Sequence, residues 1–117
     1  MINVKFVTRV GRIGCTTKVG NSPKNKLWIW IYKDITLPEI PRKSDYVKVG
    51  RGAYEVNRML MIENKNHVLV VSYSSTNLNH KKSTEEEVRK VLKGFKERGW
   101  SEFDEEHLDE YRKYLFL

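Results

Sequence analysis

The chain has 117 residues, with 22 Lys and Arg against 15 Asp and Glu, and a formal net charge of +7 at pH 7. This length suits one hydrophobic core, so we expect residues 1–117 to form a single domain. The longest apolar run, from Leu27 to Tyr32, is too short to span a bilayer, and the alternating N-terminus does not resemble a signal peptide. A single cysteine, Cys15, excludes an internal disulfide and a cysteine-based zinc site. We therefore expect a soluble, cytoplasmic protein.

The charge is distributed unevenly along the chain. Residues 1–82 hold 15 Lys and Arg and 5 Asp and Glu, a balance of +10, whereas residues 83–117 hold 7 and 10, a balance of −3. Such asymmetry bears on partners and solubility rather than on fold. It divides the domain into a basic part, residues 1–82, and an acidic part, residues 83–117.

The first third of the chain shows strand patterns. Apolar residues alternate with polar ones from Ile2 to Phe6, which is the period of a half-buried strand. Residues 11–26 contain glycines and a proline without a sustained period, which favours a long hairpin connection or mobile arm over a phosphate-binding loop. The run from Leu27 to Tyr32 places Trp28, Trp30 and Tyr32 on one face of a strand and aliphatic residues on the other.

The middle of the chain predicts a meander of three short strands. These strands are expected at residues 46–49, 54–63 and 67–73, joined by turns at 50–52 and 64–66 that contain glycine or asparagine. Pro38 and Pro41 separate them from the preceding strand.

The last part changes to a helical period. A capping pattern at residues 83–87 precedes apolar residues at helical spacing, and Gly99 is expected to end this helix. Asp104 or Ser101 can cap a second helix that carries Leu108, Tyr111 and Leu115 on one face. The expected fold is α+β: an antiparallel β-sheet or small, partly open SH3-like barrel with a C-terminal helical hairpin, and with the boundary between strands and helices at Ser83.

Two stretches resemble known families. The sequence PRKSDYVKV at residues 41–49, followed by YEVNR at 54–58, resembles a pattern of small phage and bacterial accessory proteins that begins a small SH3-like β-barrel. Phe95-Lys96, Gly99-Trp100, the acidic residues 104–106 and Tyr111 resemble the C-terminal part of Cas9-inhibiting anti-CRISPR proteins. These resemblances imply a phage or mobile-element accessory protein with an anti-defence role.

The chain shows no pattern typical of catalysis. Its histidines, His67, His80 and His107, lack metal-ligand spacing, and Cys15 has no partner base that a sequence signature would identify. The carboxylates near the prolines are typical of turns rather than of acid-base pairs. We therefore expect a non-catalytic protein without a metal or cofactor.

The basic part predicts binding of an anionic partner, because cations hold phosphate and aromatic rings stack on bases. The partner is either nucleic acid or a small nucleotide signal. The alternative for the two tryptophans is that they belong to the core. The expected ligand-binding residues are Arg9, Arg12, Lys18, Lys24, Lys26, Trp28, Trp30, Lys43, Arg51 and Arg58.

The second functional hypothesis is a protein-protein inhibitor or adaptor that blocks a host defence or polymerase component. An exposed apolar patch around Trp100, Tyr111, Tyr114 and Phe116 would favour this hypothesis. The strand from Leu27 to Tyr32 is apolar on both faces, so we also expect a homodimer that uses this strand or the apolar C-terminus.

Overall fold

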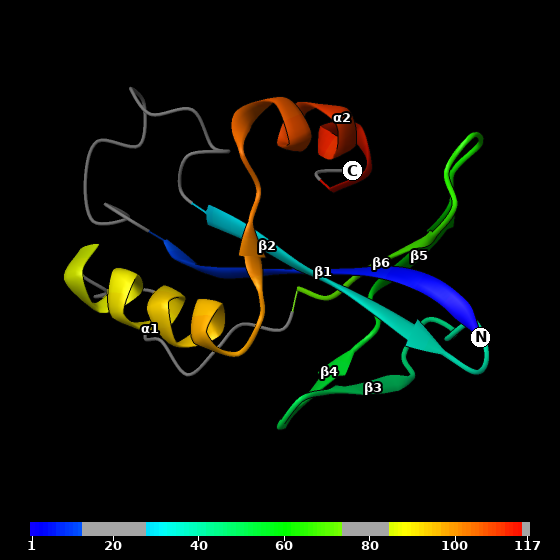
Figure 1. Cartoon of the computed structure of the whole chain (residues 1–117), viewed down its shortest axis with the longest axis horizontal. Helices are drawn as coiled ribbons and strands as arrows, with labels where there is room; N and C mark the ends of the chain where they lie inside the picture. Colours follow the sequence, from blue (N-terminus) through cyan, green and yellow to red (C-terminus); the bar gives the residue numbers. More distant parts are fainter. Residues whose placement is uncertain (13–27, 74–84, 116–117) are drawn as a thin grey trace.

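The computed structural model describes residues 1–12, 28–73 and 85–115, and predictions that concern other positions, including the loop around Cys15, lie outside this part of the chain. A five-stranded sheet with the order β5-β6-β1-β2-β7 forms its centre, and β3 and β4 form a separate hairpin (Figure 1). The elements in chain order are β1 (Ile2–Arg12), β2 (Trp28–Leu37), β3 (Tyr46–Val49), β4 (Gly52–Glu55), β5 (Arg58–Met61), β6 (Val68–Val71), α1 (Glu85–Glu97), β7 (Ser101–Glu102) and α2 (Glu105–Leu115).

The strand β1 lies in the middle of the sheet and organises its pairing. It pairs antiparallel with β2 from Ile2↔Leu37 to Arg12↔Trp28, which confirms that the two strands form a hairpin. On its other side β1 pairs with β6 from Val4↔Val68 to Val7↔Val71. Its side chains alternate between the two faces, as the sequence predicts, and both faces are covered over most of the strand.

The two helices cover opposite faces of this sheet (Figure 1). On one face, Phe6 and Ile31 pack with Phe95 of α1 and with Val47 and Val49 of the β3–β4 hairpin. The core of the other face contains Val7, Trp30, Leu69, Phe103, Tyr111 and Leu115. Because both faces of β2 are covered within one chain, its apolar run does not require a dimer.

The α+β class is confirmed, but three details of the prediction are wrong. The sheet is mixed, because β1 and β6 run parallel. The expected strand 54–63 is divided between two sheets, with β4 and β5 separated by Val56 and Asn57. The helices do not form a hairpin on one face, because β7 pairs with β2 at the sheet edge and leads the chain from one face to the other.

Hydrogen bonds explain the break between β4 and β5. The Val56 N–H donates to the Asp45 carbonyl, which keeps Val56 with the β3–β4 hairpin. At the next residue, the Asn57 N–H donates to the Val71 carbonyl, and the Asn57 side chain accepts from the Tyr73 N–H. The chain thus enters the main sheet at Asn57, and the following hairpin brings β6 beside β1 in the parallel direction.

The two predicted turns, the end of the first helix and the cap of the second are confirmed, whereas the capping residues Ser83 and Thr84 lie outside the described residues. Gly50 and Asn64 have positive φ angles of 61° and 67° in the two tight turns, and Gly99, with a φ of 92°, follows the end of α1. The Asp104 carboxylate accepts a hydrogen bond of 2.7 Å from the His107 N–H and so caps α2. In the described ranges all strands except the two-residue β7 precede Ser83, and both helices follow it.

No helix in the described ranges combines the length and the apolar character that crossing a membrane requires.

The core contact of Phe6 gives a test of the fold. Its ring lies 5.5 Å from the Tyr54 ring and 6.1 Å from the Trp100 ring, so it joins β1 to the β3–β4 hairpin and to the end of α1. We expect Phe6→Ala to lower the free energy of unfolding by about 3–5 kcal/mol, because it leaves a cavity among these rings. Met61→Ala, at an exposed position, should change it by less than about 0.5 kcal/mol. Urea denaturation measures both, and equal effects of the two substitutions would contradict this packing.

Candidate functional sites on opposite faces of the sheet

The structure describes only part of the predicted ligand-binding set. Lys18, Lys24 and Lys26 lie outside the described residues, and Arg12 and Trp28 are described as strand backbone only. The side chains that can be placed are those of Arg9, Trp30, Lys43, Arg51 and Arg58.

Three of these five side chains pack on the α2 face of the sheet. Trp30 is 2% exposed, so it belongs to the core and offers no ring face for a ligand. The Arg9 guanidinium lies 4.9 Å from the centre of the Tyr73 ring. Arg58 donates a 3.0 Å hydrogen bond from Nη1 to the Tyr114 carbonyl, near the end of α2. Arg58 thus holds the end of α2 against the sheet, whereas Arg9 packs on Tyr73 just after β6.

The other two predicted cations lie on the side of the β3–β4 hairpin. Lys43 is exposed in the turn that precedes β3, and Arg51 is exposed in the turn between β3 and β4. The predicted set is therefore split between two sides of the molecule and does not form one surface. Of its described members, only Arg51 lines a basic pocket.

This pocket, which we call the basic cleft, is a concave site of about 280 Å³ on the α1 face. Three elements each contribute one cation, and none of the described residues that line the cleft is acidic. Lys33 comes from β2, Arg51 from the β3–β4 turn and Arg98 from the end of α1. The remaining lining residues are Val49, Gly50, Gly52, Tyr54 and Trp100.

Packing holds the walls of the basic cleft in place. Lys33 Nζ donates a 2.9 Å hydrogen bond to the Arg98 carbonyl, which ties β2 to the end of α1. Trp100 is 4% exposed and lies 5.7 Å from the half-buried Tyr54 ring. Burial raises the pKa of Tyr54, and the Arg98 charge opposes this rise only in part. The Tyr54 hydroxyl therefore keeps its proton at neutral pH and can donate a hydrogen bond to an anion.

The Tyr54 ring lies against Gly52, in the space that a side chain at position 52 would occupy. A Cβ atom at this position would lie 2.9 Å from the ring atom Cε2 and 2.9 Å from the hydroxyl of Tyr54. Any side chain there would push the ring out of its position, so the glycine belongs to the cleft as much as the cations do.

The predicted ligand-binding set includes Arg51 but not Lys33, Tyr54 or Arg98. Lys33 follows directly on the aromatic strand, and Arg98 directly precedes the helix-ending Gly99. Their proximity depends on how α1 packs against β2, and this long-range arrangement leaves no local pattern.

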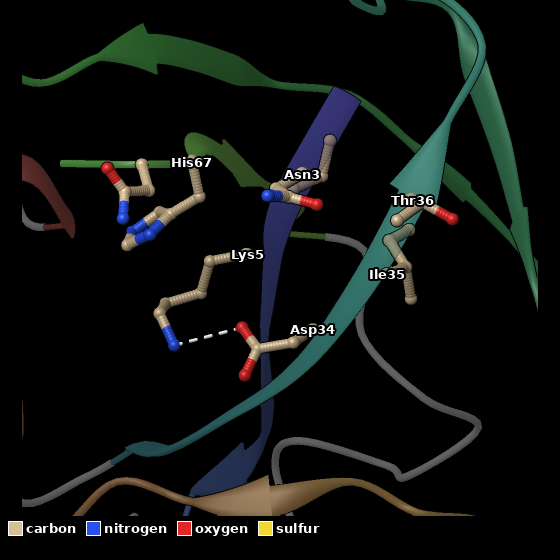
Figure 2. A pocket seen from close by; sticks show the side chains of 8 residues that line it. Asn3, Lys5, Asp34, Ile35, Thr36 and His67 are labelled. Carbon is tan, nitrogen blue, oxygen red and sulfur yellow. Dashed lines mark hydrogen bonds and ion pairs between the residues drawn. The ribbon is translucent and has the colours of Figure 1, made fainter. Parts of the chain in front are cut away.

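A second pocket, which we call the polar pocket, lies on the opposite face beside α2 and has a volume of about 500 Å³ (Figure 2). It sits over the polar ends of β1 and β2, where α2 does not cover the sheet. The residues that line it are Asn3, Val4, Lys5, Asp34, Ile35, Thr36, Asn66 and His67.

An ion pair forms the floor of the polar pocket. Lys5 Nζ lies 3.0 Å from Asp34 Oδ1 and 4.1 Å from the centre of the Tyr32 ring. The Lys5 side chain is only 8% exposed, whereas that of Asp34 is 68% exposed. The charge of the buried lysine is therefore neutralised by a carboxylate that faces the solvent.

His67 lines this pocket, and both His67 and His107 contact the buried Tyr111. The Tyr111 hydroxyl lies 2.9 Å from His67 Nε2, and the ring centres of His107 and Tyr111 are 5.4 Å apart. Burial lowers the pKa of both histidines, and the Lys5 charge lowers each further. Burial also raises the pKa of Tyr111. At neutral pH both imidazoles are thus neutral, and the phenol holds its proton.

No group of three or more His, Cys, Asp and Glu side chains within the described ranges is arranged to hold a metal ion. No family model matches the chain, and no curated protein or solved structure gives a significant match.

The lowered histidine pKa values predict a pH-dependent stability. Because the pKa values of His67 and His107 lie below 6.5 in the folded protein, the unfolded chain binds more protons as the pH falls through this range. The free energy of unfolding should therefore decrease between pH 7.5 and 5.5, above the range in which ordinary carboxylates titrate. Urea denaturation at both pH values measures the decrease, and the double variant His67→Gln, His107→Gln should show a smaller one. A free energy that rises on acidification would contradict the assignment.

Proposed function

We propose that the protein is a non-catalytic binding protein that holds a small phosphate-bearing ligand, a nucleotide, in the basic cleft. The basic part contributes Lys33 and Arg51 to this cleft, and residues 83–117 contribute Arg98. The observation that carries this proposal is the convergence of Lys33, Arg51 and Arg98 from three separate elements, with no acidic residue among the described residues that line the cleft. Placing three like charges together costs electrostatic free energy, and an anionic ligand offsets this cost.

The chemistry of the lining residues suits a phosphate group. The planar guanidinium groups of Arg51 and Arg98 can each form two parallel hydrogen bonds with phosphate oxygens, and Lys33 adds a point charge. Tyr54 offers both a hydroxyl donor and part of a ring face. The volume of about 280 Å³ lies at the small end of ligand sites and so favours a mononucleotide over an extended nucleic acid.

The buried state of Trp100 and Tyr111 favours anion binding over the inhibitor hypothesis. These side chains are 4% and 2% exposed, so the expected apolar patch is absent at both positions, and Phe116 lies outside the described residues. The resemblance to small phage accessory proteins supports an accessory role in the cytoplasm, where a nucleotide signal is available as a ligand.

The test compares two double variants with the same change in charge. Arg51→Glu with Arg98→Glu should abolish nucleotide binding, because it replaces two cations that donate hydrogen bonds to the phosphate by carboxylates that repel it. Lys90→Glu with Lys93→Glu, at exposed positions of α1, should leave it unchanged. Isothermal titration with linear and cyclic mononucleotides at several salt concentrations measures the affinities. A mononucleotide in the cleft predicts a shallow salt dependence, whereas extended nucleic acid loses affinity steeply as salt increases.

A separate variant tests the segment outside the described residues. Replacing Lys18, Lys24 and Lys26 by Glu should leave mononucleotide binding intact if the cleft alone holds the ligand. If mononucleotides, single-stranded DNA and RNA all fail to bind at low salt, the anion-binding proposal is wrong. The inhibitor hypothesis, in which the partner is a protein, then becomes the better explanation.

The shape of the cleft gives a further prediction. Gly52→Ala should weaken nucleotide binding roughly tenfold, because the new Cβ displaces the Tyr54 ring and its hydroxyl donor. Met61→Ala, at an exposed position of β5 outside the cleft, is the control and should leave the affinity unchanged. Equal affinities for the two variants would show that Tyr54 does not contact the ligand.

A further inference from the structure

The polar pocket differs from the basic cleft in its electrostatics. The Lys5 and Asp34 charges cancel at 3.0 Å, and the neighbouring Lys65 forms an ion pair with Glu110. His67 is neutral at neutral pH. The charged groups near it are Lys5, Asp34 and Lys65, and its neighbours on α2 are His107 and Tyr111. A charged ligand would therefore find no uncompensated partner here, whereas a neutral ligand with strong dipoles would find several.

Asp34 is fixed in a position from which it can accept further hydrogen bonds. Its Oδ1 atom is held by Lys5, but a carboxylate has about four acceptor sites. The side chain is 68% exposed and faces the pocket, on the same side of β1 as the Lys5 ammonium and the His67 ring (Figure 2). A carboxylate in this setting matches a pair of adjacent N–H donors on one edge of a ligand.

Other residues that line the polar pocket can donate hydrogen bonds to an acceptor atom of the ligand next to its two N–H groups. The Tyr111 hydroxyl and His67 Nε2 share a hydrogen bond of 2.9 Å, so this ring nitrogen already has a partner. The amides of Asn3 and Asn66 also line the pocket. Their side-chain N–H groups can donate hydrogen bonds to a carbonyl oxygen of a ligand.

We propose that the polar pocket binds a neutral cyclic amide with two adjacent N–H donors and a carbonyl on one edge, the hydrogen-bonding pattern of guanine. Asp34 accepts from the two N–H groups, and the side-chain amides of Asn3 and Asn66 donate to the carbonyl oxygen. A guanidinium ion offers the same pair of donors, but its charge would be repelled by the Lys5 ammonium, 3.0 Å from the accepting carboxylate. This site is separate from the basic cleft, which lies on the other face of the sheet.

The experiment titrates the protein with guanosine, inosine, adenosine and L-arginine, observed by amide chemical shifts. We expect guanosine to bind and to shift the amides of Asn3, Asp34 and Asn66. Inosine lacks the exocyclic amine, so it should bind roughly tenfold more weakly, as the loss of one hydrogen bond to a charged group implies. Adenosine has the same ribose, but its base has an acceptor nitrogen in place of the ring N–H of guanine and an amine in place of the carbonyl. Equal binding of adenosine and guanosine would therefore overturn the proposal. Preferential binding of L-arginine would overturn it as well.

Variants locate the site. Asp34→Asn should lower guanosine affinity at least roughly tenfold, whereas Glu39→Gln, which neutralises an exposed carboxylate outside the pocket, should not change it. Because Asp34→Asn also removes the partner charge of Lys5, Asn66→Ala gives an independent test that leaves the ion pair intact, and it should weaken binding several-fold. Unchanged affinity in Asn66→Ala, or no guanosine binding by the unaltered protein, would refute the site.

The double variant Arg51→Glu, Arg98→Glu of the basic cleft should bind guanosine normally. A failure of the polar-pocket proposal can therefore be distinguished from a failure of the nucleotide proposal.

Discussion

The register between β1 and β2 determines what each face of the protein can bind. In this register Phe6 lies opposite Lys33, and Lys5 lies opposite Asp34. Because successive side chains of a strand point to opposite faces, Lys33 reaches the basic cleft and Asp34 reaches the polar pocket. A shift of the pairing by one residue would exchange the faces of one strand, bury charges in the core and remove both sites. The apolar alternation of β1 prevents this shift, since Val4, Phe6 and Val10 are all buried on one face.

The helices complete the two sites in different ways. On one face α1 ends at Glu97, and the residues after it bring Arg98 and Trp100 to the β3–β4 turn, so the end of the helix closes the basic cleft. On the other face α2 covers the apolar region around Val7 and Leu69 but leaves the polar ends of the strands accessible. The short strand β7 makes this arrangement possible, because it pairs with β2 at the edge of the sheet between the two helices.

The local features of the fold could be predicted from the sequence, and the long-range ones could not. Alternation identified β1 and β2, and Gly50, Asn64, Gly99 and Asp104 marked turns and helix ends, because these depend on neighbouring residues alone. The parallel pairing of β6 and the separation of the helices depend on tertiary packing. The same limit applies to the sites. Arg51 was recognised by residue type, whereas the pairing of Lys5 with Asp34 requires the register. Trp30 proved to be core because α2 covers it.

The most direct test of the proposed function is a map of backbone amide shifts on titration with a mononucleotide. The proposal predicts that shifts concentrate at Lys33, at residues 50–52 and at residues 98–100, and that Asn3, Asp34 and Asn66 stay unchanged when the nucleotide carries adenine. Shifts that concentrate around Arg9 and Arg58 instead, or the absence of any shift at millimolar nucleotide and low salt, would contradict it.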